Sequence, residues 1–270
     1  MKSLSQKLRP GLGAAYRSAW PKLLATAIVL GIWQLGYLLE LKPEYVLPGP
    51  AAVFEELRNR VVDADFWSAV ATTMSRAGVG FALALLAGST LGVAVSRVRA
   101  LRLAIGSMIT GLQTMPSIAW FPFAILIFGL GEQAILFVVV LGAAPAIANG
   151  VIAGVDTVPP AYFRLGRMLG ARGWSLYRFI VLPAMLPPYF AGLTQGWAFA
   201  WRSLMAGELL VIIAERPSLG AQLEFARQFA DAPMLLATMI VILAIGMLID
   251  GSLSAASQRI RVGRGLQSAK

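Results

Sequence analysis

The chain has 270 residues, 58% of them hydrophobic and only 13% charged, which excludes an ordinary water-soluble domain, where about a quarter of residues are charged. The sequence contains no cysteine and no histidine, so disulfides, thiolate metal sites and the most common proton-transfer side chain are excluded. The formal net charge is +10, and in a chain this apolar we interpret the basic residues as a signal of membrane orientation rather than of nucleic-acid binding.

Six apolar segments are each close to the length of about 20 residues that a helix needs to cross a membrane. They cover residues 23–39, 77–96, 103–128, 134–155, 187–213 and 233–249. The sequence therefore predicts an all-α membrane protein with about six spans in a single domain, residues 23–258. Residues 1–22 and 259–270 are expected to be tails. Between the first two spans, residues 45–70 are expected to form a proline-containing turn followed by a short amphipathic helix with Val53, Leu57 and Val61 on one face.

Prolines interrupt two of the apolar segments. Pro116 and Pro122 lie in the third segment and Pro145 lies in the fourth. Because proline removes a backbone donor and clashes with the preceding turn, we expect broken or bent helices at these residues. Pro116 and Pro122 are therefore candidates for a gate or a kink.

Most of the 23 lysines and arginines lie in segments that six spans would place on one side of the membrane. These segments are the N-terminal tail, the turn after the second span, the loop around residues 156–183 and the C-terminal tail. Most acidic residues lie on the other side. The positive-inside rule then predicts that the loop and both termini are cytoplasmic.

The loop contains a compact basic sequence, YFRLGRMLGARGWSLYRFIVLP, that begins at residue 162. Asp156 or Thr157 can cap a helix whose first turn holds two prolines, and Gly170 can end it. The apolar residues of this helix recur at helical spacing on one side: Tyr162, Leu165, Met168 and Leu169. A second short helix, residues 174–181, is expected to end before Pro183.

A helix of about ten residues is not stable alone in water and needs a surface on which to pack. One interpretation is an interfacial loop whose arginines contact lipid phosphates. The other is a docking helix whose apolar side fills a groove in a cytoplasmic partner, with the arginines around the rim. The residues alone leave both alternatives open.

The loop also resembles the segment that marks the permease subunits of bacterial ABC importers, a pattern of E-A-A, a glycine four residues later, and I-x-L-P. The matching residues are Gly170, Ala171, Ile180, Leu182 and Pro183. The leading triplet departs from the pattern, because Arg164, Leu165 and Gly166 stand where Glu, Ala and Ala are usual. The contact made by an acidic residue in that family is therefore not expected here.

Three further segments are similar to elements of the sulfonate, taurine and nitrate permeases: LPGPAAVFEEL, MPSIAWFPFAILIFGLGE, and AWRSLMAGELL followed by PSLG. The resemblance implies a type I-like importer in the bacterial inner membrane, with a second copy of the permease, two cytoplasmic ATPase subunits and an extracytoplasmic substrate-binding protein. It also implies that the short helix is the coupling helix that contacts the ATPase. The implied coupling residues are Tyr162, Arg164, Leu165, Arg167, Met168, Leu169, Gly170, Ala171 and Arg172.

The chain has no G-x-x-x-x-G-K-[ST] sequence, so we expect it to be a transport subunit and not an enzyme, with ATP and Mg bound by the partner ATPase. No cofactor or metal is expected in the chain itself. The expected cargo is a small anion, most simply an aliphatic sulfonate, with taurine, nitrate or another small nutrient as alternatives. A proton-coupled secondary transporter is the alternative of another class, and six spans without a visible inverted repeat support it poorly.

Several residues inside the spans are candidates for the pathway or the substrate site, because polar groups at membrane depth usually face a pathway or a partner. They are Arg202, Glu208, Gln195, Trp197, Trp201 and Gln113. Helical spacing places Trp197, Trp201 and Glu208 on one face and Gln195 and Arg202 on another. Arg202 and Glu208 lie about 120° apart, so a local ion pair is not expected. Arg202 can attract an anion, or it can pair with a neighbouring helix, and Gln113 can instead bond between helices.

Overall fold

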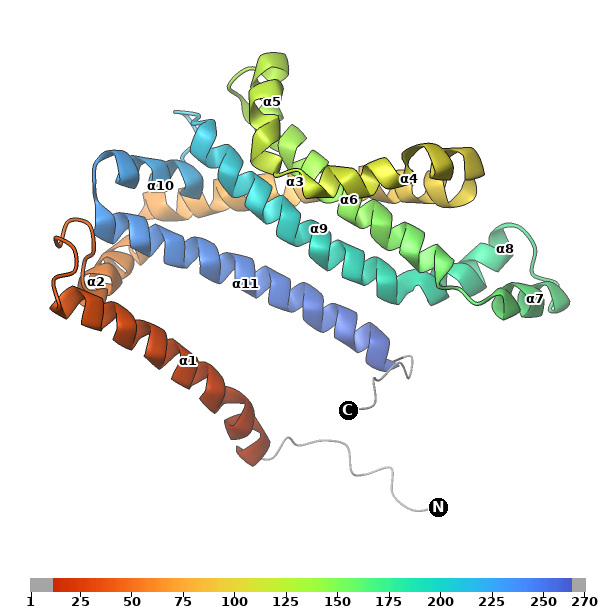
Figure 1. The fold of residues 1–270 in the computed structure, drawn as a ribbon, viewed down its shortest axis with the longest axis horizontal. Coiled ribbons are helices and arrows are strands. Elements are labelled where there is room, and N and C mark those ends of the chain that lie inside the picture. Colours follow the sequence, from red (N-terminus) through yellow and green to blue (C-terminus); the bar gives the residue numbers. More distant parts are fainter. Residues whose placement is uncertain (1–11, 264–270) are drawn as a thin grey trace. The chain divides into compact units, whose positions relative to one another are not determined.

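The computed structural model describes residues 12–263, and in this range the chain forms helices and no strand (Figure 1). The predicted all-α fold class is confirmed. The basic residues Lys2, Lys7, Arg9, Arg264 and Lys270, on which part of the orientation argument rests, lie outside the described residues.

The chain divides into two compact units. The first consists of the residues up to Val62 together with Ala226–Ala237, and the second consists of Asp63–Phe225 and the residues from Thr238 onward. Helix α1 (Leu12–Leu38) and helix α2 (Pro50–Val61) belong to the first unit. The short amphipathic helix predicted between the first two spans is therefore present as α2, whereas α1 begins earlier than the apolar segment predicted from residue 23.

The first unit is held together at the turn between its two helices. The indole Nε1 of Trp33 donates a hydrogen bond to the carbonyl oxygen of Pro48 at 3.0 Å. The Tyr37 ring lies so close to Gly49 that a Cβ at this position would be 3.1 Å from it. Pro50 then occupies the first turn of α2, where its missing N–H costs no helical hydrogen bond.

The second unit contains the long helices of the molecule and the short elements that join them. In chain order these are α3 (Ala64–Arg97), α4 (Arg99–Thr114), the 3-10 turn η1 (Ser117–Trp120), α5 (Phe121–Phe128), α6 (Glu132–Asp156), α7 (Pro160–Met168), α8 (Trp174–Leu176), the π-helical turn η2 (Tyr177–Val181) and α9 (Leu182–Leu210). Helices α10 (Leu219–Gln228) and α11 (Ala232–Gly263) continue from one unit into the other.

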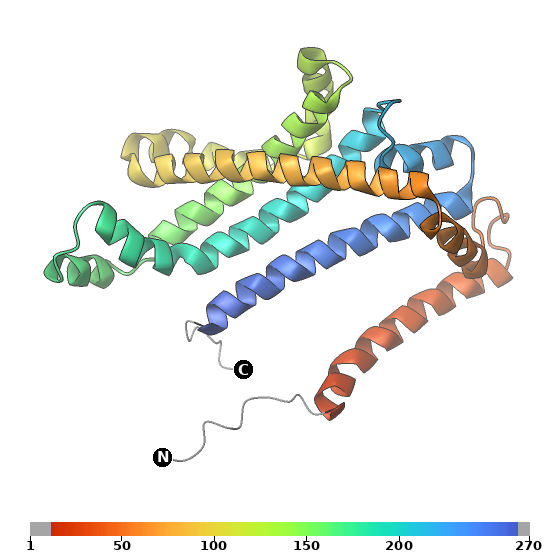
Figure 2. The same cartoon turned by 180° about the vertical axis from the view of Figure 1, so that it is seen from behind.

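Helix α6 is the centre of the second unit and packs against both α3 and α9 (Figures 1 and 2). Its apolar residues surround the helix on all sides, as expected for a buried span. Small residues let the backbones approach closely: a Cβ at Gly88 of α3 would lie 2.5 Å from the carbonyl oxygen of Ala144, and one at Gly150 would lie 2.7 Å from the Cα of Gly192. This close packing supplies the contacts that replace a hydrophobic driving force in lipid.

Four helices among the described residues are long and apolar enough to cross a membrane. They are α3, α6, the continuous helix Trp174–Leu210, and α11 up to Ile260. A fifth crossing is possible if α4 and the helix Ser117–Phe128 act together as one broken span. The apolar part of α1, Leu23–Leu38, is shorter than these.

The break in the third predicted span is at Pro116, as expected. Helix α4 ends at Thr114, and the following arm is bent from it by 106°. Figures 1 and 2 both show α5 standing away from α4. Pro122 lies in the first turn of α5, where proline is tolerated. No break occurs at Pro145, because α6 continues through it between two closely packed neighbours that support the helix.

Candidate functional site

Helix α7 is the short helix predicted in the basic loop, but its N-terminus differs from the prediction. It begins at Pro160 after Pro159, with no side-chain cap. Thr157 instead closes α6 through a backbone hydrogen bond to Ala153 at 3.0 Å. The Asp156 carboxylate forms an ion pair with Arg102 of α4. Neither residue caps α7, because Pro159 occupies the N-cap position and Pro160, the first helical residue, has no N–H that needs an acceptor.

The C-terminus of α7 follows the prediction: the helix ends at Met168, and Gly170 terminates it two residues later. The N–H of Ala171 donates to the Gly166 carbonyl at 2.9 Å, and the N–H of Gly170 donates to the Arg167 carbonyl at 3.1 Å. This pair of bonds is a Schellman motif, which needs a residue in the left-handed region. Gly170 has a φ of +80° and meets that need without strain.

Helix α7 contacts the rest of the second unit through Gly166, one of the residues that depart from the family pattern. Gly166 is buried, and a Cβ there would overlap the side-chain ends of Leu176 and Ile180. The absence of a side chain therefore lets α7 lie directly on α8 and the π-helical turn.

Phe163 of α7 is partly buried against the cluster of Val151, Val158, Val181 and Met185. Four other apolar side chains of α7 and its C-terminal turn have no such cover in this chain. The exposed fractions are 49% for Tyr162, 55% for Leu165, 77% for Leu169 and 84% for Met168. Arg164, Arg167 and Arg172 are exposed as well. We call this set of residues, with Gly170 and the partly buried Ala171, the α7 surface.

The segment after α7 is continuous with α9, so the prediction that it ends before Pro183 is wrong. Helix α8, the π-helical turn and α9 follow one another without a gap, and Pro183 lies in the first turn of α9. A regular α-helix would be interrupted by the proline ring and its missing N–H. The wider π-helical turn directly before it accommodates both.

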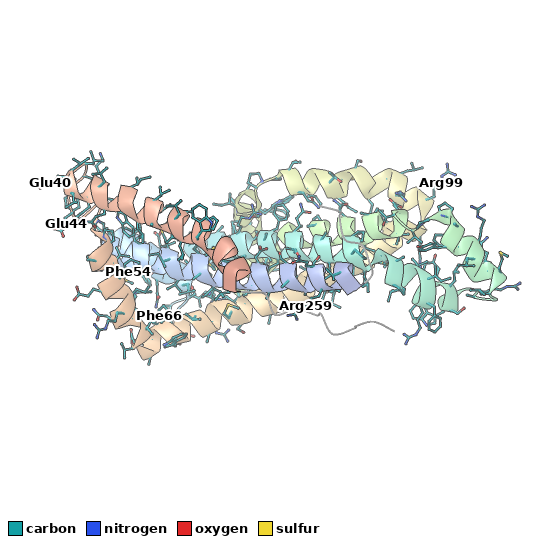
Figure 3. All side chains as sticks on the ribbon, turned by 90° about the horizontal axis from the view of Figure 1, so that it is seen from below. Glu40, Glu44, Phe54, Phe66, Arg99 and Arg259 are labelled. Atoms are coloured by element: carbon teal, nitrogen blue, oxygen red, sulfur yellow. The ribbon has the colours of Figure 1, made fainter. Side chains whose placement is uncertain are left out.

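Two contacts join the ends of α3 and α4 to this region. The Arg97 guanidinium lies over the Tyr177 ring, 4.5 Å from its centroid, and Arg102 pairs with Asp156. Figure 3 shows Arg99 at this end of the second unit and Phe66, near the start of α3, at the other end. The end with the α7 surface is therefore rich in arginine.

A buried cluster of charges lies toward the opposite end. The Glu208 side chain is fully buried and accepts hydrogen bonds from Thr73 Oγ1 at 2.9 Å, Arg76 Nη1 at 3.0 Å and the Gly220 N–H at 3.1 Å. Thr73 Oγ1 in turn accepts the Leu219 N–H at 3.0 Å. Four polar groups are thus satisfied around a single carboxylate.

A second carboxylate extends the cluster toward the surface. Arg76 donates to Glu132 Oε1 from Nε at 3.2 Å and from Nη2 at 2.9 Å, and Arg216 donates to the same oxygen at 3.1 Å. The Arg76 side chain is 3% exposed, whereas that of Arg216 is 62% exposed. We call Thr73, Arg76, Glu132, Glu208 and Arg216 the Glu208 cluster.

The cluster lies far along α3 from the end that carries the α7 surface. Arg76 precedes the end of α3 at Arg97 by about 30 Å, which is about the thickness of the hydrocarbon layer of a membrane. Sequence reasoning singled out Glu208 but missed Thr73, Arg76, Glu132 and Arg216 as its neighbours. The available signal was the rule that an ionisable residue in a span needs a partner of opposite charge.

The residues predicted to share a face of α9 do lie on the same face. Trp197 is buried, its ring stacks on that of Trp201 at 6.0 Å, and Trp201 lies against Gly246 of α11. Gln195 and Arg202 are exposed on another face. Arg202 donates to the Ala198 carbonyl at 2.9 Å and does not pair with Glu208, as expected.

Gln113 lies just before the break at Pro116 and is partly buried. The amide nitrogen of Gln113 is buried, and so is the hydroxyl of Ser203 on α9. Neither atom has a hydrogen-bond partner among the residues that the structure describes. A Cβ at Gly142 would overlap the Ser203 hydroxyl, so that hydroxyl is enclosed by the close contact of α6 and α9. No group of three or more metal-ligating side chains occurs among residues 12–263.

Residues 43–262 match the family described as "Binding-protein-dependent transport system inner membrane component". The chain belongs to this family. The matched residues include the whole α7 surface and the whole Glu208 cluster.

Two relatives illustrate the similarity to curated members of this family. The taurine transport system permease protein of Escherichia coli strain K12 is 28% identical over 239 residues, 87% of this chain and 86% of the relative. The putative aliphatic sulfonates transport permease protein of Bacillus subtilis strain 168 is 26% identical over 235 residues, 87% of this chain and 84% of the relative. Other relatives are a riboflavin transport system permease protein of Chloroflexus aurantiacus and a nitrate import permease protein of Leptolyngbya laminosa.

The family fold is also shown by solved structures. The MetNI methionine ABC transporter, in an inward-facing conformation, matches with a TM-score of 0.59 and 20% identity over 71% of this chain and 94% of that chain. The protein is thus an importer permease for small solutes with a type I transmembrane fold, a transport component rather than an enzyme.

Proposed function

We propose that two copies of this chain form the membrane pathway of an ATP-driven importer for a small anionic solute, and that the α7 surface binds a separate cytoplasmic ATPase. The observation that carries the proposal is the uncovered apolar side of a nine-residue helix at the arginine-rich end. Such a short helix gains stability from a partner that buries this side, and arginines at the rim suit acidic groups around a groove.

The sequence supports the division of labour between subunits. It has no phosphate-binding loop of the G-x-x-x-x-G-K-[ST] type, so ATP and Mg are assigned to the partner ATPase. The arginines at the α7 end favour a cytoplasmic location for that end under the positive-inside rule. The Glu208 cluster is then on the extracytoplasmic side, where a substrate-binding protein would dock.

Arg202 supports an anionic cargo. It precedes Glu208 on α9 by about 9 Å along the helix, so it lies deeper in the hydrocarbon layer than the cluster. Its side chain is exposed in the isolated chain. An arginine at this depth is costly against lipid and favours a water-filled pathway or a partner subunit. Among the relatives' named solutes, aliphatic sulfonates and nitrate are anions and taurine carries a sulfonate, so an aliphatic sulfonate is the first candidate and taurine, nitrate or another nutrient the alternatives.

The test is uptake into proteoliposomes that contain the transporter isolated from native membranes, with solute-binding protein outside and ATP inside. We expect uptake of radiolabelled alkanesulfonate only when ATP is present, and a P-loop ATPase in the purified complex. Uptake that continues without ATP but stops when the proton gradient is dissipated would instead indicate a secondary transporter.

Replacement of Arg202 by alanine should lower uptake of an anionic solute about tenfold at subsaturating concentration, equivalent to about 1.4 kcal/mol of lost attraction. Arg202→Lys keeps the positive charge and should retain most of the uptake. The ATPase should co-purify with both variants. Uptake by Arg202→Ala equal to that of the wild type would remove Arg202 from the pathway.

A further inference from the structure

Helix α11 carries a single acidic residue within its candidate span Ala232–Ile260, and this residue, Asp250, belongs neither to the Glu208 cluster nor to the α7 surface. Its carboxylate is exposed and forms no ion pair or hydrogen bond within residues 12–263. The apolar segment predicted at residues 233–249 ends one residue before it. A carboxylate in contact with lipid is costly, so an unpaired one inside a span usually faces a water-filled pathway or a ligand.

Asp250 lies about halfway between the Glu208 cluster and the arginine-rich end of the second unit. Within this unit, α11 runs beside α9 in the opposite direction (Figures 1 and 2). The two helices touch where a Cβ at Gly246 would be 2.8 Å from Trp201 Nε1. Trp201 lies about 10 Å from Glu208 along α9, and Asp250 lies about 6 Å farther in the same direction along α11. The sum is about half of the roughly 30 Å that α3 covers from the cluster to its other end.

The positive charge of Arg202 lies at nearly the same depth. Its Nε donates to the Ala198 carbonyl at 2.9 Å, and its guanidinium carbon is 4.9 Å from the centroid of the Phe199 ring. Because Ala198 is one helical turn closer to the α7 end, the side chain carries its charge back along α9 toward the level of Asp250. The two terminal nitrogens of Arg202 have no hydrogen bond to any described residue.

Arg202 and Asp250 also lie on the same side of this pair of helices. The contact of Trp201 with Gly246 marks the line along which α9 and α11 face each other. Seen from the α7 end, successive residues turn clockwise by about 100° in α9 and anticlockwise by the same angle in the antiparallel α11. Arg202 is then about 100° clockwise from Trp201, and Asp250 is about 40° anticlockwise from Gly246. Both rotations lead to the same side, where both side chains are exposed.

Two fixed charges of opposite sign at one depth and on one side favour a particular pattern of charge in a ligand. A simple anion is attracted by Arg202 but repelled by Asp250, and a simple cation experiences the reverse. A solute that carries both charges gains an ion pair at each end. The carboxylate therefore attracts the cationic end of such a solute and disfavours a competitor that has only the anionic end.

We propose that Arg202 and Asp250 form a binding site for a zwitterionic solute, an aminosulfonate such as taurine. Arg202 binds the sulfonate, and Asp250 binds the ammonium group. This inference rests on the proposed function, because it needs a water-filled pathway on this side of α9 and α11. It narrows the small anionic solute of that proposal to one that also carries a positive charge.

The test is equilibrium binding of radiolabelled taurine to the purified transporter, the permease with its ATPase, in lipid nanodiscs. The solute-binding protein is omitted, so that its own specificity does not contribute. The competitor is 2-hydroxyethanesulfonate, which has the same sulfonate and nearly the same size but a hydroxyl in place of the ammonium group. We expect the wild type to bind taurine at least about tenfold more tightly, the contribution of one charge-assisted hydrogen bond.

Asp250→Asn should lower the affinity for taurine about tenfold and leave that for 2-hydroxyethanesulfonate unchanged or higher, because the repulsion is removed as well. Asp250→Glu keeps the charge and should retain the preference for taurine. Arg202→Ala should weaken the binding of both solutes. Glu215→Gln removes an exposed acidic residue from the segment between α9 and α10 and is the control for loss of negative charge.

The outcomes separate this inference from the proposed function. Equal affinities for the two solutes in the wild type, a preference kept by Asp250→Asn, or no binding of taurine at millimolar concentration would overturn the site while ATP-dependent uptake stands. Failure of Asp250→Asn to assemble, with assembly restored by exchanging the two charges in Arg202→Asp and Asp250→Arg, would show that the residues pair with each other instead. Absence of ATP-dependent uptake by the wild type would overturn the proposed function itself.

Discussion

Replacement of Leu165 by aspartate is expected to release the ATPase from the transporter and to abolish ATP-dependent uptake. Leu165 is 55% exposed on α7 and makes no part of the packing between spans, so the helices should remain folded. A leucine side chain buried in a partner contributes about 1.5–3 kcal/mol, and burial of a carboxylate in its place costs more. The affinity for the ATPase should therefore fall at least about 100-fold. The measurement is co-purification of the ATPase from detergent, together with uptake.

Val62→Asp is the matched control for this experiment. Val62 is an 83% exposed apolar residue in the turn after α2, away from the α7 surface in sequence. The same change of side chain there should leave both ATPase binding and uptake intact. If Leu165→Asp retained both as well, the α7 surface would not be the ATPase contact, and the lipid-facing interpretation of the loop would be favoured.

Removal of Arg76 is expected to have the largest effect on stability. Arg76→Met leaves the buried Glu208 carboxylate without its cation, and breaking such a pair costs about 3–5 kcal/mol. The midpoint of thermal unfolding in detergent should fall by about 10 °C. The double variant Arg76→Met and Glu208→Met removes both charges and should recover part of this loss, because an apolar pair of similar volume is often as stable as a buried ion pair. The recovery is incomplete because the Thr73 hydroxyl and the Gly220 N–H lose Glu208 as their acceptor.

Arg216→Met is the matched variant at an exposed arginine. Like Arg76, Arg216 pairs with Glu132, but its side chain is 62% exposed. Its unfolding free energy should change by less than about 1 kcal/mol. A single Arg76→Met variant no less stable than Arg216→Met would contradict the assignment of Arg76 and Glu208 as the structural centre of the cluster.

The features that the sequence predicted are those set by nearby residues. Gly170 terminates α7 because a residue in the left-handed region is needed directly after the helix. The spacing of Gln195 and Arg202 gave the correct phase of α9. The same periodicity could not show which of the two faces was buried, because that depends on where α6 and α11 lie.

The contacts of the Glu208 cluster could not be predicted from patterns of neighbouring residues. The bond between Arg76 and Glu208 joins residues 132 positions apart, and the backbone donors of Leu219 and Gly220 carry no side-chain signal at all. Helical spacing excluded Arg202 as a partner for Glu208 on the same helix, but it did not indicate which basic residue of another segment would pair with Glu208. The choice of Arg76 follows from the packing of α3 against α6 and α9, which only the fold reveals.

The chain continues helically into α9 through Pro183, although a proline in this position predicts the end of a helix. The π-helical turn at Tyr177–Val181 fits one residue more into the helix than an α-helical path would. Each residue of an α-helix advances the chain by about 100° around its axis. The number of residues in the π-helical turn therefore affects the direction in which the apolar side of α7 faces. A homologue or variant that lost one residue in this turn would keep every side chain of α7 and yet present them to a different neighbour.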